Sequence, residues 1–166
     1  YLVPWLCDYK GEAIFMDSDM LCYTDITKIP RNPDAVSVVK NKLRFEWPSL
    51  MVFNCDQCKD LTPEYIETKE PQSLEWAYTV GALPSEWNHL VGYDEPQQAK
   101  IIHYTQGIPC FEEVQHCEYS KEWMNEAQVV NSAVPWVTLM GNSVHAQPVL
   151  ERIQRESQTS QHQPAA

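Results

Sequence analysis

Short apolar segments, separated by stretches rich in proline, glycine and charged residues, limit what this chain of 166 residues can fold into. They are residues 13–16 (AIFM), 35–39 (AVSVV), 49–55 (SLMVFNC) and 100–104 (KIIHY). Segments of this length and composition are typical of β-strands, and none approaches the ~20 apolar residues that a membrane span needs. Helices are expected from Thr62, which can cap a first turn that starts with proline, and over residues 118–131. Strands interleaved with helices predict a single α/β domain.

Several finer features of the fold follow from the same patterns. The unbroken apolar run at 13–16 predicts a strand buried on both faces, as in a mainly parallel sheet. Either Thr24 or Asp25 is expected to cap a short helical turn, and residues 83–96 read as an ordered loop. In the helix over 118–131, the apolar spacing predicts a core-facing side made of three residues. These residues are Tyr119, Trp123 and Met124.

The end of the chain has a different composition from the rest. Residues 1–141 are expected to form the folded part, and residues 142–166 a polar tail. Within this tail we expect a short amphipathic helix from Pro148 to Arg155, followed by a disordered end rich in serine and glutamine.

The charge of the chain excludes several classes of partner. Twelve lysines and arginines, scattered along the sequence, stand against 23 aspartates and glutamates, which gives a net charge of -11. Such a protein would repel nucleic acid and anionic lipid surfaces, so we expect neither as its main partner. It would hold an anionic small molecule only if a metal cation or helix N-termini offset the local field.

Six cysteines are too few for a disulfide framework in a chain of this length, so we expect reduced thiols and a cytoplasmic protein. The sequence CDQC at residues 55–58 has the spacing of a zinc-binding pair. The candidate partners Cys110, His116 and Cys117 are distant, and a second close pair is lacking. Structural zinc is therefore a minor alternative.

Asp17 and Asp19 come directly after the first apolar segment. In an extended chain they project to the same side, where each carboxylate raises the pKa of the other. A divalent cation would remove this conflict, and the carboxyl end of a strand is where open α/β sheets bind ligands. Oxygen ligands favour Mg²⁺ or Mn²⁺, and an added imidazole favours Mn²⁺. In the alternative, Asp17 caps a turn and Asp19 faces water.

An apolar strand that ends in Asp-x-Asp also resembles the start of the haloacid dehalogenase-like phosphatases. That resemblance would make Asp17 a nucleophile and Asp19 a general acid. In that family, however, a threonine or valine usually follows, and a late strand ends in paired acids. Here the chain continues as DMLC and no later strand candidate ends in paired acids, so a phosphatase is the weaker alternative.

A more specific resemblance rests on several blocks that occur in order. They are GEAIFMDSDMLCYTDI, WPSLMVFNC, LPSEWNHLVG and AKIIHYTQGIPCF. In order and spacing they resemble bacterial glycosyltransferases similar to the glycogenin and lipopolysaccharide galactosyltransferase group, over about residues 1–125. The resemblance implies a GT-A fold, with a mixed central sheet flanked by helices. It also implies an enzyme that moves a sugar from a nucleoside-diphosphate sugar, most often a UDP-sugar, to an acceptor that the sequence does not identify.

The resemblance also implies roles for individual residues. Asp17 and Asp19 match the motif that holds Mn²⁺ or Mg²⁺ against the diphosphate, and His103 matches the third protein ligand of the metal. Gly107 matches a glycine whose backbone lies near the diphosphate. The remaining donor- and acceptor-binding assignments are Ser18, Ser49, Trp87 and Asn88. An aromatic face and an amide suit hydroxyl-rich ligands, although Trp87 is as readily interpreted as a core residue.

Parts of the family pattern are missing. Ile108 and Cys110 stand where better-known members carry a phosphate-binding lysine and a tryptophan, and their Asp-Gln-Asp stretch has no counterpart. The catalytic residue and the stereochemical course, retaining or inverting, therefore stay open. The sequence starts one element before the Asp-x-Asp strand, so we expect it to be amino-terminally truncated and to lack the nucleotide-binding strands. An inactive fragment or a non-catalytic interaction module of the same fold is the alternative.

Overall fold

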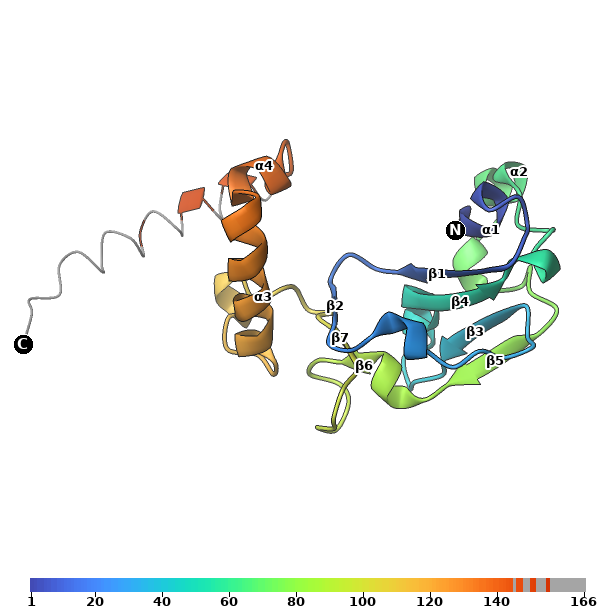
Figure 1. Ribbon diagram of the computed structural model, residues 1–166, viewed down its shortest axis with the longest axis horizontal. Coiled ribbons are helices and arrows are strands. Elements are labelled where there is room, and N and C mark those ends of the chain that lie inside the picture. The colour runs from blue at the N-terminus through green and yellow to red at the C-terminus, as the bar shows by residue number, and fades with distance from the viewer. Residues whose placement is uncertain (145, 148–149, 152–154, 156–166) are drawn as a thin grey trace, which may run out of the picture. The chain divides into compact units, whose positions relative to one another are not determined.

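The computed structural model describes residues 1–144, 146–147, 150–151 and 155 (Figure 1). It divides the chain into two units, Tyr1–Thr105 and Gln106–Ala166. The boundary expected between residues 141 and 142 therefore falls inside the second unit. The tail at 156–166, and most of the helix expected from Pro148 to Arg155, lie outside the described residues.

A four-stranded mixed sheet forms the centre of the first unit, as the α/β prediction requires. Its strands are β1 (Glu12–Met16), β3 (Val36–Val39), β4 (Leu50–Asn54) and β5 (Val80–Leu83), in the order β1-β4-β3-β5 (Figure 1). β4 runs antiparallel to both β1 and β3, and β3 runs parallel to β5. Consequently β1, β3 and β5 all point the same way, and their carboxyl ends lie at one edge of the sheet.

The prediction that the first strand is buried on both faces is wrong. β1 is an edge strand that pairs only with β4, antiparallel, and its apolar residues are half-buried. The strands of this sheet that are buried on both faces are β3, whose four residues are all buried, and β4, in which Leu50, Met51, Val52 and Phe53 are all buried. The run at 13–16 is as apolar as a central strand, but composition does not determine how many neighbours a strand finds.

A smaller sheet contains β2 (Met20–Cys22), β6 (His89–Leu90) and β7 (Ile101–His103), in the order β2-β7-β6. β7, the strand expected near 100–104, is its buried central member; it pairs antiparallel with β2 and parallel with β6. β2, β5 and β6 were not expected, and β6 lies within the stretch predicted as a loop. Strands of two to four residues carry too little periodicity to be recognised in a sequence.

Alternating side chains of the larger sheet build two cores. On one face Val36, Val38, Met51 and Phe53 pack together, and Trp76 stacks on Phe53 with ring centroids 6.0 Å apart. On the other face the cluster contains Ile29, Val39, Leu50, Val52, Leu83, Trp87 and Ile101. Both faces are therefore covered, and only the strand ends are available for a site.

The short helices of the first unit follow the capping signals. α2 (Pro63–Thr68) begins after Thr62, whose side chain accepts a hydrogen bond from the Tyr65 amide at 3.1 Å, which confirms the expected cap. The 3-10 helix η1 (Ile26–Lys28) is capped by Asp25, so Asp25 and not Thr24 is the cap of this turn. The first unit also contains α1 (Val3–Leu6).

The second unit contains α3 (Ser120–Ala133) and α4 (Trp136–Met140). α3 confirms the helix expected over 118–131, shifted by two residues. The prediction that one side of this helix faces the core is wrong, because no residue of α3 is buried and Met124 is 37% exposed. Apolar spacing identifies the face of a helix that can be buried, but not whether anything covers it.

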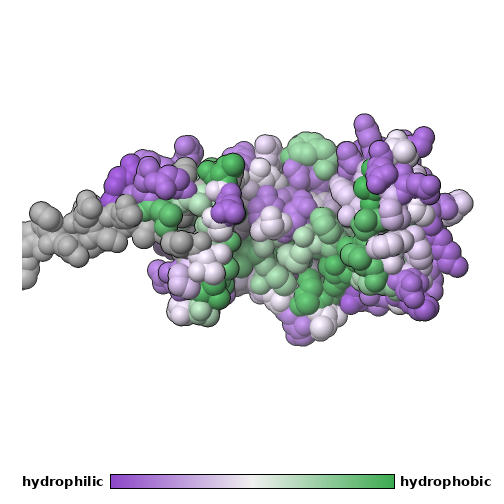
Figure 2. All heavy atoms as spheres, turned by 90° about the horizontal axis from the view of Figure 1, so that it is seen from above, coloured by the Kyte–Doolittle hydropathy of each residue, from purple (hydrophilic) through white to green (hydrophobic). Residues whose placement is uncertain are grey.

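No helix among the described residues is long and apolar enough to cross a membrane. On the face in Figure 2, hydrophilic side chains are interspersed with smaller hydrophobic groups.

None of the six cysteines forms a disulfide, and those of the CDQC segment are buried. Burial, with a contribution from Cys7, raises the pKa of Cys55 to about 11, and burial raises the pKa of Cys58 to about 12. The thiol of Cys58 donates to the carbonyls of Ala35 and Asn54, each at 3.2 Å. Among the described residues, no group of three or more potential ligands that includes this pair converges closely enough to hold a metal ion, so they do not support a zinc site there.

We therefore expect Cys55 and Cys58 to resist alkylation in the native protein near pH 8, because a protonated, buried thiol is a poor nucleophile. Exposed Cys7 should react much faster under the same conditions. Pulse labelling with iodoacetamide followed by peptide mass spectrometry measures each site, and labelling in denaturant is the control. Rapid native labelling of Cys58 would contradict this description of the core.

Candidate metal centre

Three residues that the sequence marks as metal ligands come together in the first unit. Asp17, Asp19 and His103 each offer one ligand atom, and these atoms all lie within 4.8 Å of one another. Asp17 follows the end of β1, Asp19 precedes β2, and His103 ends β7. The triad thus lies at the edge of the larger sheet where β1, β3 and β5 end, as expected for a ligand site.

Backbone hydrogen bonds hold the two aspartates in place. The Asp17 amide donates to the Ser49 carbonyl at 2.9 Å, and the Asp19 carbonyl accepts from the Tyr104 amide at 3.1 Å. Ser18 and Asp19 form a turn, so the extended conformation expected through Ser18 is wrong. The carboxylates approach one another because β1 and β2 are joined by a tight turn and β2 pairs with β7, not because side chains alternate along one strand.

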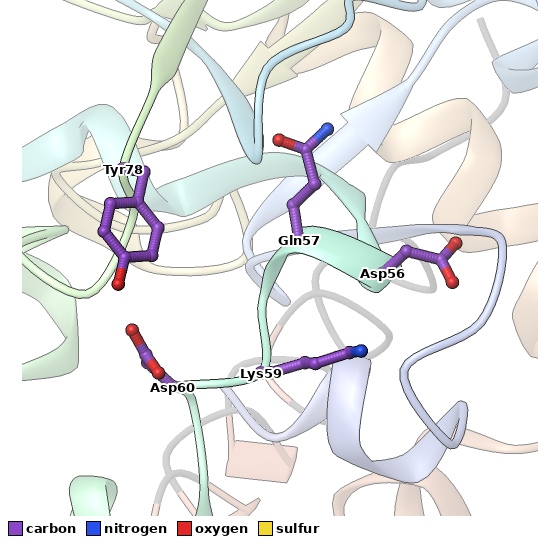
Figure 3. Close-up of a pocket in the computed structure, with 5 residues that line it drawn as sticks. All are labelled: Asp56, Gln57, Lys59, Asp60 and Tyr78. Carbon is purple, nitrogen blue, oxygen red and sulfur yellow. The ribbon is translucent and has the colours of Figure 1, made fainter.

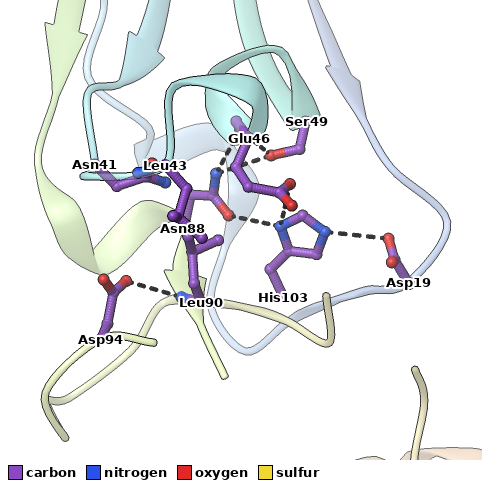
Figure 4. Close-up of polar contacts among 9 residues, drawn as sticks. All are labelled: Asp19, Asn41, Leu43, Glu46, Ser49, Asn88, Leu90, Asp94 and His103. Carbon is purple, nitrogen blue, oxygen red and sulfur yellow. Dashed lines mark hydrogen bonds and ion pairs between the residues drawn. The ribbon is translucent and has the colours of Figure 1, made fainter. Parts of the chain in front are cut away.

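His103 is 2% exposed and lies between two partners (Figure 4). Its Nε2 is 3.4 Å from Asp19 Oδ1, and its Nδ1 is 3.1 Å from Asn88 Oδ1. Because Asn88 Oδ1 is an acceptor, the proton of a neutral imidazole belongs on Nδ1. This tautomer leaves the lone pair of Nε2 directed at the carboxylates, as a metal ligand requires.

The orientation of the Asn88 amide is itself fixed. Its Nδ2 donates to Ser49 Oγ at 2.9 Å and to the Glu46 carbonyl at 3.4 Å. The Ser49 hydroxyl in turn donates to the Glu46 carbonyl. Asn88 is fully buried, so exchanging the amide oxygen and nitrogen would break these bonds without help from water. Ser49 and Asn88 therefore act on the site by orienting His103.

The pKa values of the two aspartates are shifted in opposite directions. Burial and the neighbouring Asp19 raise the pKa of Asp17, whereas a hydrogen bond from the cationic imidazole of His103, which carries a proton on Nε2 as well as on Nδ1, lowers the pKa of Asp19. The expectation that each carboxylate raises the pKa of the other is thus right only for Asp17, because the imidazole compensates Asp19. When the imidazole is neutral, its lone pair and two carboxylates converge, and a cation between them would relieve the repulsion of the carboxylates. Two oxygens and one imidazole nitrogen suit Mn²⁺.

Sequence reasoning missed Glu46, which lies in the 3-10 helix η2 (Arg44–Ser49). Its Oε2 is 3.8 Å from His103 Nδ1, and its side chain is 14% exposed. Burial first, and then Asp17 and Asp19, raise the pKa of this carboxyl, while His103 opposes the shift. A signal existed in the segment EWPS, since Glu46 precedes Ser49 by three residues and such positions share one side of a 3-10 turn.

The other predicted site residues are placed differently. Trp87 is 1% exposed and belongs to a core cluster, so the prediction of a sugar-facing wall is wrong and the core interpretation is correct. Ser18 is exposed in the turn between the aspartates. Gly107 belongs to the second unit and has a φ of 115°, which favours glycine. The assignment of Ser18 and Gly107 to donor binding stays a prediction.

A pocket of about 260 Å³ lies elsewhere in the first unit (Figure 3). It is lined by Asp56, Gln57, Lys59, Asp60 and Tyr78, and does not include the triad. In Figure 3 the carboxylate of Asp60 points toward the ring of Tyr78, whereas Asp56 and Lys59 point away. All five lining residues are exposed. This pocket lacks the buried, converging polar groups that distinguish a binding site.

Comparison with known proteins gives one distant similarity. Protein CDI of Arabidopsis thaliana is 30% identical over an alignment 164 positions long, which covers 79% of this chain and 63% of the relative. The chain thus spans less than two thirds of the relative's length. The relative is a plant protein, whereas the sequence blocks resemble bacterial enzymes. No family model matches the chain, and no solved structure does.

We expect Asp19→Ala to weaken Mn²⁺ binding by at least about a hundredfold, because it removes one of three protein ligands. Titration of free Mn²⁺ by electron paramagnetic resonance measures the affinity. Asp60→Ala, which removes an exposed aspartate of the same unit, is the matched control and should bind Mn²⁺ like the parent. Equal affinities of Asp19→Ala and the parent protein would rule out the site.

Proposed function

We propose that this protein is a metal-dependent glycosyltransferase of GT-A fold. In this proposal it moves a sugar from a nucleoside-diphosphate sugar, a UDP-sugar, to an acceptor. One observation carries the proposal: the ligand atoms of Asp17 and Asp19, which are close in the sequence, and of the distant His103 lie within 4.8 Å of one another. The chain covers 63% of the length of its plant relative, so the activity of the whole protein is also a proposal.

Each residue has a part in the proposed chemistry. The two aspartates and His103 Nε2 hold the ion, and Asn88 keeps the proton of the imidazole on Nδ1. A bound Mn²⁺ or Mg²⁺ would stabilise the negative charge that develops on the leaving nucleoside diphosphate. Glu46, on the Nδ1 side of the ring, makes this side more negative and so increases the basicity of Nε2 as a ligand.

Two further observations support the proposal. The mixed sheet presents the ends of β1, β3 and β5 at one edge, which is where α/β proteins place ligand sites. In addition, a chain of net charge -11 needs a cation to hold a diphosphate, and the triad supplies a site for one. A cytoplasmic location, where nucleoside-diphosphate sugars are available, belongs to the same proposal.

The proposal predicts that Mn²⁺ strengthens UDP binding to this chain by at least about tenfold, because an ion held by the carboxylates would supply positive charge for the diphosphate. Isothermal titration of UDP with Mn²⁺ and with EDTA measures the effect. It should vanish in Asp19→Ala and persist in Asp60→Ala. Release of UDP from a panel of UDP-sugars then tests turnover.

Other outcomes identify the alternatives. Mn²⁺ binding without any UDP binding would support the alternative of a non-catalytic module of the same fold. Hydrolysis of p-nitrophenyl phosphate that is lost in Asp17→Asn, with no UDP binding, would identify a phosphatase. UDP affinity that is the same in Mn²⁺ and in EDTA would contradict the metal-dependent mechanism.

A further inference from the structure

A short basic segment stands out in this acidic chain. Lys40, Lys42 and Arg44, which we call the basic segment, place three cations within five residues of a protein with net charge -11. All three are exposed. Among the described residues, none of them forms an ion pair with a carboxylate. Basic side chains elsewhere do form such pairs, namely Lys10, Arg31 and Lys100.

The basic segment lies at the same edge of the sheet as the metal centre. It directly follows β3, and Asp17 directly follows β1; both strands run antiparallel to β4, so both end at this edge. Arg44 also begins η2, the 3-10 helix that brings Glu46 to within 3.8 Å of His103. The cations and the metal ligands are therefore carried by adjoining elements.

An aromatic ring positions two of these cations without neutralising them. Arg44 Cζ lies 5.3 Å and Lys40 Nζ 5.9 Å from the centroid of the Trp47 ring. Trp47 is fixed by a hydrogen bond from its Nε1 to the Asn41 carbonyl at 3.0 Å. A guanidinium over a ring still presents its N–H groups at its edges, where an oxyanion can accept them.

We propose that the basic segment binds an oxyanion, a phosphate or a carboxylate, carried by the acceptor of the sugar. This inference rests on the proposed transferase function. Three carboxylates and a divalent ion leave the metal centre with a net negative charge, which would repel an anionic acceptor. Lys40 Nζ donates to the Val80 carbonyl at 2.7 Å, so Lys42 and Arg44 are the cations at this edge that offset the repulsion. Phe45, 71% exposed next to Arg44, offers an apolar face for the sugar ring of such an acceptor.

The test uses glucose 6-phosphate as the probe and unmodified glucose as its neutral counterpart. Titrations of the 166-residue chain are followed by backbone amide shifts. We expect saturable shifts at residues 40–45 with glucose 6-phosphate, none with glucose, and weaker binding as salt rises. Lys42→Gln with Arg44→Gln should weaken binding by about tenfold or more. Lys59→Gln, an exposed lysine of the same unit, is the matched control and should bind like the parent.

The outcomes separate this inference from the proposed function. Binding of glucose 6-phosphate does not need Mn²⁺ or turnover, so it can succeed where Mn²⁺-dependent UDP binding fails. Equal binding of glucose, an equal loss in Lys59→Gln, or no loss in the double variant would each overturn the inference. It would also be overturned if the double variant lost UDP binding and kept glucose 6-phosphate binding, because the cations would then serve the donor. Thermal unfolding confirms that each variant is folded.

Discussion

The hydrogen bond between Asn88 and His103 is the interaction on which the candidate site depends. It connects β7 to the segment after β5, inside a part of the molecule that water does not reach. By fixing the proton on Nδ1, it determines that Nε2 faces the aspartates as an electron-pair donor. The turn between β1 and β2 then brings Asp17 and Asp19 to this nitrogen. Without the Asn88 contact, the same three residues would have no defined ligand geometry.

Charge is arranged at the carboxyl edge of the sheet in two adjoining regions. The half-buried carboxylates gather around His103, and the exposed cations of the basic segment follow β3. Each region is incomplete alone, since converging carboxylates need a cation and unpaired cations need an anion. A protein whose net charge is -11 can thereby hold negatively charged ligands without a basic surface overall.

Much of this arrangement could be predicted from the sequence. The apolar runs located four strands, and the capping signals of Thr62 and Asp25 located helix starts, because these features depend on local chemistry. The edge position of β1 and the pairing of β2 with β7 depend on contacts between distant segments, which local patterns do not encode. Glu46 and the role of Asn88 were missed for the same reason, since each acts through His103, far along the chain.

The most direct test of the central claim is electron spin echo envelope modulation of Mn²⁺ bound to this chain. The technique detects nitrogen nuclei coupled to the ion. The account predicts modulation from one directly coordinated imidazole nitrogen, lost in His103→Gln and altered when the protein is labelled with ¹⁵N-histidine. Bound Mn²⁺ without nitrogen modulation, or with modulation that persists in His103→Gln, would contradict it.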